Sequence, residues 1–110
     1  MTNEKIIKQM VFEEYEESNA EHESTFTDLN HGFGVLHEEV REVLAEIETI
    51  EMLHDAIDDL VMANDTHQLK DALANIKQRS VYAIQELVQV AAMADKFVIT
   101  IEMERMKVQK

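Results

Sequence analysis

The sequence predicts an all-α protein built as a helical bundle, and two observations indicate this class. The 110 residues include two glycines and no proline, the residues that interrupt helices most strongly. Apolar residues recur at alternating spacings of four and three over two long stretches, as in helices that pack along their length. Because the length fits a single domain, we expect one all-helical domain with an N-terminal helix and loop (1–28), a core helical hairpin (29–98) and a C-terminal helical tail (99–110).

The N-terminal part is expected to begin with a short amphipathic helix over residues 3–18. Its apolar side consists of Ile6, Ile7, Met10, Val11 and Tyr15. Residues 19–30 are polar and contain residues that cap helices well, namely Ser24, Thr27, Asp28 and Asn30. We predict that this stretch is a loop that delivers Phe26 and Leu29 to the core.

Two heptad seams then predict two long helices that fold back on each other as an αα-hairpin. The first seam consists of Leu29, Phe33, Leu36, Val40, Val43, Ile47, Ile50, His54, Ile57 and Val61. A break at residues 63–68, with Thr66 as the expected N-cap, precedes the second seam of Leu69, Leu73, Ile76, Ser80, Ala83, Leu87, Val90, Ala94, Phe97 and Ile101. Gly32 and Gly34 near the first helix start permit either a close approach of backbone or ligand, or only a tight entry.

The apolar surface predicts self-association. One short helix cannot cover both apolar faces of so long a hairpin, so we expect a homodimer or homotetramer. The uncovered side stripe consists of Leu44, Met52, Leu60, Ile84, Ala91, Met93 and Val98. The N-terminus lacks the apolar core of a signal peptide, and no apolar run approaches the ~20 residues of a membrane span. With no cysteine, the chain suits a reducing cytosol, and we expect a soluble, cytoplasmic protein without membrane contact.

Acidic residues are concentrated in the first part of the chain, within a formal net charge of −13. Residues 1–65 hold 18 acidic and 3 basic residues, whereas residues 66–110 hold 5 and 7. Binding to nucleic acid is not expected, because phosphate contacts need clustered lysine and arginine. Three uses of the excess carboxylates remain: binding cations, binding a basic protein partner, or self-association.

Some of these carboxylates flank the seams. Glu39, Glu42 and Glu46 each precede a seam residue, and spacings of three and four place them on one helical face. The matching position on the last helix is held by Glu86, Gln89 and Lys96. Converging carboxylates would suit Mg²⁺, which prefers oxygen ligands. Interhelical pairing with Lys or Arg is the alternative.

Two segments resemble a known enzyme family. Residues 36–47, LHEEVREVLAEI, resemble the first metal motif, Glu-Glu-x-x-Glu, of the MazG-like all-α nucleoside triphosphate pyrophosphohydrolases. Residues 86–96, ELVQVAAMADK, resemble their second motif, Glu-x-x-Asp followed by an apolar helix. The pattern, which includes HGFGVLHEEVRE and spans about residues 29–98, is also similar to short MazG-like proteins of phages and prophages. The resemblance implies a dimeric or tetrameric helical bundle that converts a nucleoside triphosphate to the monophosphate and pyrophosphate with Mg²⁺ or Mn²⁺.

The resemblance also implies roles for individual residues. Glu39, Glu42 and Glu86 match metal ligands, and Glu38 is the leading carboxylate that assists catalysis. Gln89 occupies the position of the family's aspartate and offers a carbonyl oxygen without charge. Either the activity has been lost in this chain, or another carboxylate takes the place of that aspartate. The candidates are Asp55, Asp58 and Asp59, in the stretch between the motifs, which is longer than is usual for the family.

Other polar residues have two interpretations each. His31 is a candidate contact for the nucleotide or a capping residue, and Lys96 is a candidate contact for the triphosphate or an ion-pair partner. The seam positions of His54 and Phe33 favour the core.

The alternative hypothesis belongs to a different functional class: a non-catalytic acidic helical module that binds a basic protein partner.

Overall fold

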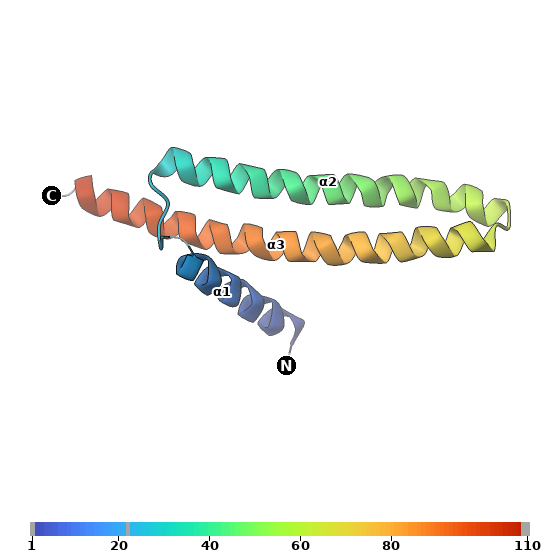
Figure 1. The fold of residues 1–110 in the computed structure, drawn as a ribbon, viewed down its shortest axis with the longest axis horizontal. Helices are drawn as coiled ribbons and strands as arrows, with labels where there is room; N and C mark the ends of the chain where they lie inside the picture. The colour runs from blue at the N-terminus through green and yellow to red at the C-terminus, as the bar shows by residue number, and fades with distance from the viewer. Residues whose placement is uncertain (1, 22, 109–110) are drawn as a thin grey trace. The chain divides into compact units, whose positions relative to one another are not determined.

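The computed structural model describes residues 2–21 and 23–108, and within them it contains three α-helices and no strand (Figure 1). They are α1 (Asn3–Glu21), α2 (Leu29–Met62) and α3 (Thr66–Val108). The predicted all-α class is thus confirmed, with a short first helix and two long ones. The helix expected over residues 3–18 extends to Glu21, and residues 99–108 of the expected tail continue α3. Residues 1, 22, 109 and 110 lie outside the described residues.

The two long helices begin at aspartate caps. The Asp28 carboxylate accepts a hydrogen bond from the backbone N–H of His31 at 2.8 Å, and the Asp65 carboxylate accepts one from Gln68 N–H at 3.1 Å. Both satisfy backbone donors that a helix start leaves without an intrahelical acceptor. The expectation that Thr66 caps α3 was therefore wrong, because the preceding aspartate takes that role.

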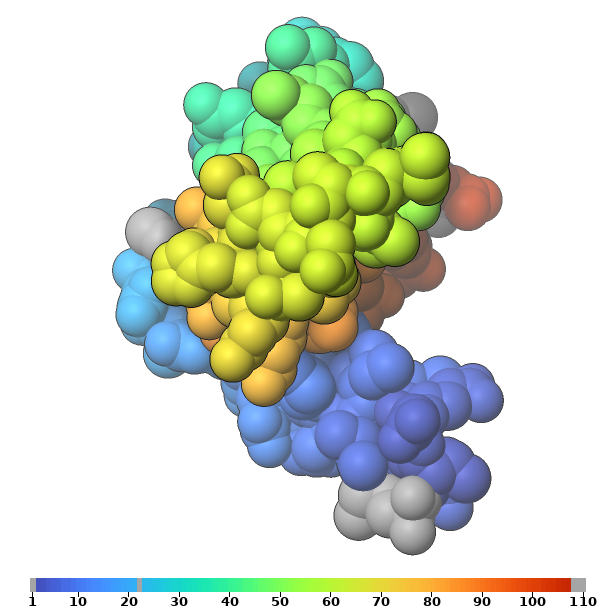
Figure 2. Space-filling model, turned by 90° about the vertical axis from the view of Figure 1, so that its right-hand side faces the viewer, coloured from blue at the N-terminus to red at the C-terminus, as the bar shows by residue number. Residues whose placement is uncertain are grey.

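The connection between α2 and α3 is a tight turn. Asn64 adopts a left-handed conformation with φ of 54°, which asparagine tolerates better than most residues. The N–H groups of Asn64 and Asp65 donate to the carbonyls of Val61 and Leu60, so these two carbonyls in the last turn of α2 are satisfied. This yellow-green part of the chain faces the viewer in Figure 2.

The chain divides into two compact units. The terminal unit comprises residues 1–40 and 87–110, and therefore holds α1, the first turns of α2 and the second half of α3. The hairpin unit, Arg41–Glu86, holds the remainder of α2 and α3 as an antiparallel pair around the turn (Figure 1). No helix among the described residues is long and apolar enough to cross a membrane.

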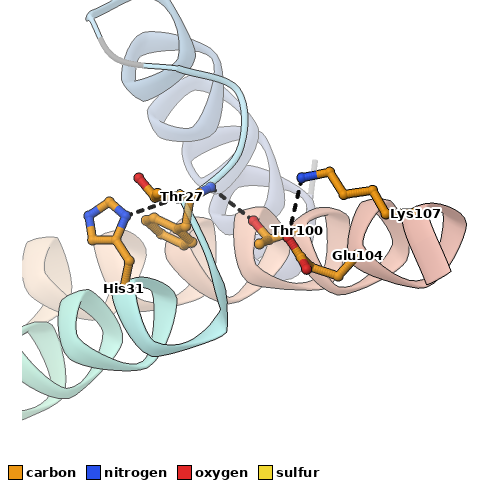
Figure 3. Close-up of polar contacts among 6 residues, drawn as sticks. Thr27, His31, Thr100, Glu104 and Lys107 are labelled. Carbon is orange, nitrogen blue, oxygen red and sulfur yellow. Dashed lines mark hydrogen bonds and ion pairs between the residues drawn. The ribbon is translucent and has the colours of Figure 1, made fainter.

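The core of the terminal unit is built around Phe26 from the loop before α2. Its side chain is 6% exposed and clusters with Ala92 and Met93 of α3, with residues of all three helices packed around them: Val11, Tyr15, Val35, Leu36 and Phe97. Phe26 N–H donates to the Thr100 hydroxyl at 2.9 Å (Figure 3). That hydroxyl donates to the Lys96 carbonyl at 3.0 Å. The loop thus delivers Phe26 to the core, as predicted. Leu29 is instead 46% exposed.

The two glycines of α2 have different surroundings. A Cβ at Gly32 would lie 3.0 Å from the Phe26 ring and 3.2 Å from the Phe97 ring, whereas a Cβ at Gly34 would meet nothing within 4 Å. Gly32 therefore allows the first turn of α2 to approach two aromatic rings closely. Of the two interpretations, close approach holds for Gly32.

Burial departs from the predicted seams at several positions. Phe33 is 64% exposed and stacks on His37 outside the core, while the His54 side chain is 78% exposed beside Asp55. The expectation that Phe33 and His54 are core residues was wrong. In the hairpin unit the buried apolar residues are Val43, Ala72 and Ala83, since only a narrow strip of each helix is covered when two helices pack as a pair.

Candidate metal centre and adjoining pocket

Two glutamates of the hairpin unit come close together. Glu42 of α2 and Glu86 of α3 each offer a carboxylate oxygen, and the two oxygens lie within 4.8 Å of each other. Glu39 lies in the terminal unit, three residues before Glu42 on α2, which places both side chains on one face of that helix. The helices of the hairpin unit thus bring together two of the carboxylates that the sequence singled out, and we call these two the carboxylate group.

The donor set suits a hard divalent cation. Each side chain offers only oxygen atoms, the ligands that Mg²⁺ and Mn²⁺ prefer, and no thiol or imidazole belongs to the group. Glu42 is exposed and Glu86 is partly buried, so the position is reachable from solvent. Two like charges at this separation repel each other, and a bound cation would relieve that repulsion.

A pocket of about 620 Å³ lies in the terminal unit. Its walls come from α1, from the loop that precedes α2, and from the facing sides of α2 and α3. Most of its charged side chains are carboxylates. The residues that line it are Glu14, Glu17, Ser18, Glu21, Glu23, Thr25, Phe26, Thr27, His31, Val35, Glu39, Gln89, Met93 and Lys96.

Lys96 brings a buried cation to this pocket. The residue is 3% exposed, its Nζ donates a hydrogen bond to the Ser18 hydroxyl at 3.3 Å, and the ammonium lies 5.1 Å from the centre of the Phe26 ring. Burial lowers the pKa of Lys96 from its ordinary value of 10.5, because desolvation disfavours the charged form. A ligand with an anionic or carbonyl oxygen would give the Lys96 ammonium stronger hydrogen-bond acceptors than the Ser18 hydroxyl and the Phe26 ring provide.

His31 offers a second donor on the same wall. Thr27 N–H donates to His31 Nδ1 at 3.1 Å (Figure 3), which assigns the proton of the neutral ring to Nε2. The ring also packs edge-on against Phe26, with the ring centres 5.3 Å apart. Phe26 therefore supports both Lys96 and His31.

The structure places the predicted site residues in two sets. His31, Glu39, Gln89 and Lys96 line the pocket of the terminal unit, whereas Glu42 and Glu86 form the carboxylate group of the hairpin unit. Glu38 is exposed and belongs to neither set.

The three aspartates proposed as substitutes do not join the group. Asp55 is thirteen residues beyond Glu42 on α2, which corresponds to about 20 Å along the helix. Its side chain is 84% exposed beside His54, and Asp58 and Asp59 lie farther along the same helix. None of them therefore stands in for the acid that Gln89 replaces.

Sequence reasoning missed the contributions of Ser18 and Phe26 to the pocket. Ser18 lies in a run of glutamates that is typical of a solvated face, and Phe26 was assigned only to the core.

Comparison with models of protein families, with curated proteins and with solved structures finds no match to this chain. Function is therefore inferred from the chemistry of these residues and from the motif resemblance.

Proposed function

We propose that the protein is a Mg²⁺-dependent nucleoside triphosphate pyrophosphohydrolase, similar to the MazG-like enzymes, that produces a nucleoside monophosphate and pyrophosphate. The observation that supports this most directly is the carboxylate group formed by Glu42 and Glu86. These residues, like Glu39, match the metal ligands of the family's motifs, and they come from two helices. A solvated face of one helix would not produce such a group.

In this proposal Glu42 and Glu86 hold the cation, and Glu39 and Gln89 are the further ligands that the motif resemblance implies. Bound Mg²⁺ or Mn²⁺ would neutralise charge that develops on the phosphates and make water a better nucleophile. The carboxylates would also determine where the triphosphate lies, because both would bind the same cation. Glu38, which was expected to assist catalysis, is exposed and lies outside the carboxylate group, so no role is assigned to it.

The pocket residues have the matching task of binding the nucleotide. Lys96 Nζ and His31 Nε2–H are hydrogen-bond donors on a wall otherwise rich in carboxylates. Donors of this kind suit the oxygens of a phosphate or of a base carbonyl. Because the Lys96 amine is largely removed from water, a hydrogen bond to it would be stronger than at the surface.

Self-association and a cytoplasmic location form part of the proposal. Apolar residues of the hairpin unit remain about half exposed in this chain, among them Leu44, Leu73 and Ile84. A second copy would cover such residues in a homodimer or homotetramer. Nucleoside triphosphates are cytoplasmic metabolites, and a chain without cysteine tolerates that reducing compartment.

The test is release of pyrophosphate from a panel of ordinary and modified nucleoside triphosphates with Mg²⁺ or Mn²⁺. Release that is lost in the double variant Glu39→Gln/Glu42→Gln and kept in Glu48→Gln supports the proposal. Glu48 is a suitable control because it is an exposed glutamate of α2 outside the group. A folded protein that releases no pyrophosphate from any substrate would contradict the proposal.

A further inference from the structure

A half-buried ion pair lies in the hairpin unit, one helical turn beyond Glu42. Glu46 of α2 is paired with Arg79 of α3, with Arg79 Nη1 at 3.5 Å from Glu46 Oε1. The guanidinium also lies 5.5 Å from the centre of the Tyr82 ring. The side chains of Glu46 and Arg79 are 23% and 40% exposed, so both charges are partly removed from water.

Both side chains of this pair carry hydrogen-bonding groups beyond the two atoms that form the ion pair. Glu46 Oε2 is enclosed and has no hydrogen-bond partner among the described residues. On Arg79, the ion pair with Glu46 uses Nη1, and a guanidinium carries five N–H groups in a planar fork. The fork therefore has more donors than the one that contacts Glu46.

The pair lies close in sequence to the candidate metal ligand Glu42. Glu46 follows Glu42 by four residues, about 6 Å along the helix axis, and the Arg79 guanidinium contacts Glu46. The other basic residues of the hairpin unit, Arg41, Lys70 and Lys77, are exposed, whereas Arg79 is partly buried. Arg79 is therefore the partly buried cation of this unit, and it contacts a glutamate one helical turn from Glu42.

We propose that Arg79 binds a phosphate group of the metal-bound triphosphate, and afterwards of the pyrophosphate product, while Glu46 and Tyr82 hold its guanidinium in position. The planar fork matches two phosphate oxygens, which a lysine ammonium cannot do. Glu46 and Tyr82 restrict the long side chain before the ligand arrives, so less conformational entropy is lost on binding. This inference rests on the proposed function, because Glu42 and Glu86 would have to hold a cation for the phosphates to lie near Arg79.

The experiment measures binding of inorganic pyrophosphate in the presence of Mg²⁺ by calorimetry. Removing Arg79 alone would leave the partly buried Glu46 without its partner and endanger folding, so the principal variant is Glu46→Gln/Arg79→Gln. Arg79→Lys keeps the charge without the fork, and Lys77→Gln removes an exposed charge two residues away on the same helix. Mn²⁺ binding to each variant reports whether the carboxylate group is intact.

We expect the double variant to bind pyrophosphate at least about tenfold more weakly, since each charge-assisted hydrogen bond contributes about tenfold or more. Arg79→Lys should recover part of that loss, and Lys77→Gln should change affinity less than about twofold. Mn²⁺ affinity should be equal in all four proteins.

Three results would overturn the inference, and they separate it from the proposed function. Unchanged pyrophosphate affinity in the folded double variant overturns the role of Arg79 and leaves the enzyme standing. The same holds if the native protein binds Mn²⁺ but no pyrophosphate, provided that it still releases pyrophosphate from a triphosphate. A native protein without Mn²⁺ binding and without release refutes the proposed function, and the inference falls with it.

Discussion

The two glycines of α2 provide a matched pair of perturbations, Gly32→Ala and Gly34→Ala. Both glycines lie within the same helix, where alanine is favoured over glycine by about 0.5–1 kcal/mol. At Gly34 a Cβ meets nothing within 4 Å. We therefore expect Gly34→Ala to stabilise the protein by about that amount.

The same substitution at Gly32 adds a steric cost. The new methyl group would lie 3.0 Å from the Phe26 ring and 3.2 Å from the Phe97 ring. Phe26 cannot move freely, because it is buried and its backbone N–H is bonded to the Thr100 hydroxyl. Overpacking of a filled core costs about 1–3 kcal/mol, so the two alanine variants should differ by about 1–3 kcal/mol.

The assay is urea unfolding followed by circular dichroism, with all proteins at one concentration because self-association changes apparent stability. The gain in helix propensity is common to both variants, so their difference isolates the contact with the rings. Equal free energies of unfolding for Gly32→Ala and Gly34→Ala would refute this reasoning. The rings would then be able to yield without cost, and Phe26 would not be a rigid support for Lys96 and His31.

Three other substitutions test individual contacts of the fold. Asp65→Ala removes the N-cap of α3 and should cost about 0.5–2 kcal/mol, measured by thermal unfolding; no loss would mean that another group caps the helix. Thr100→Val should cost about 1–3 kcal/mol, because it leaves the N–H of Phe26 buried without its acceptor; an unchanged urea midpoint would contradict the role of that hydrogen bond. Lys96→Met should be more stable than the native protein at neutral pH, because the lowered pKa of Lys96 means that folding disfavours its charged form. The free-energy cost of burying the charged amine is full below the folded pKa and disappears as pH rises to the unfolded pKa near 10.5. The greater stability of Lys96→Met should therefore shrink over this range, and a stability difference that stays constant with pH would contradict this prediction.

The sequence predicted the helices well because their signals are local. The apolar spacing of three and four, the missing proline and the polar stretch before residue 29 define where helices can run. The cap of α3 was misplaced by one residue, since Asp65 and Thr66 are both good N-caps and only the backbone geometry decides between them. The periodicity also placed Glu39 and Glu42 on one face, opposite Glu86 if the helices pair.

Burial was predicted less well, because it depends on what covers each helix. Phe33 and Leu29 hold seam positions but are exposed, while Lys96 and Thr100, which precede seam positions, are buried. In the terminal unit α1 and the loop with Phe26 cover a different strip of α3 from the one that the heptad pattern marks. No spacing rule within α3 reveals that second layer.

The sequence by itself determined the class of fold, the approximate ends of the helices and the shared helical face of Glu39 and Glu42, since these follow from backbone propensity and helical period. Only the tertiary structure decided that Gly32 faces two rings, that burial lowers the pKa of Lys96, and that Glu46 pairs with Arg79. These properties arise between side chains far apart in sequence. Their energies depend on distances of a few ångströms and on exclusion of water, neither of which is encoded in the order of residues along one helix.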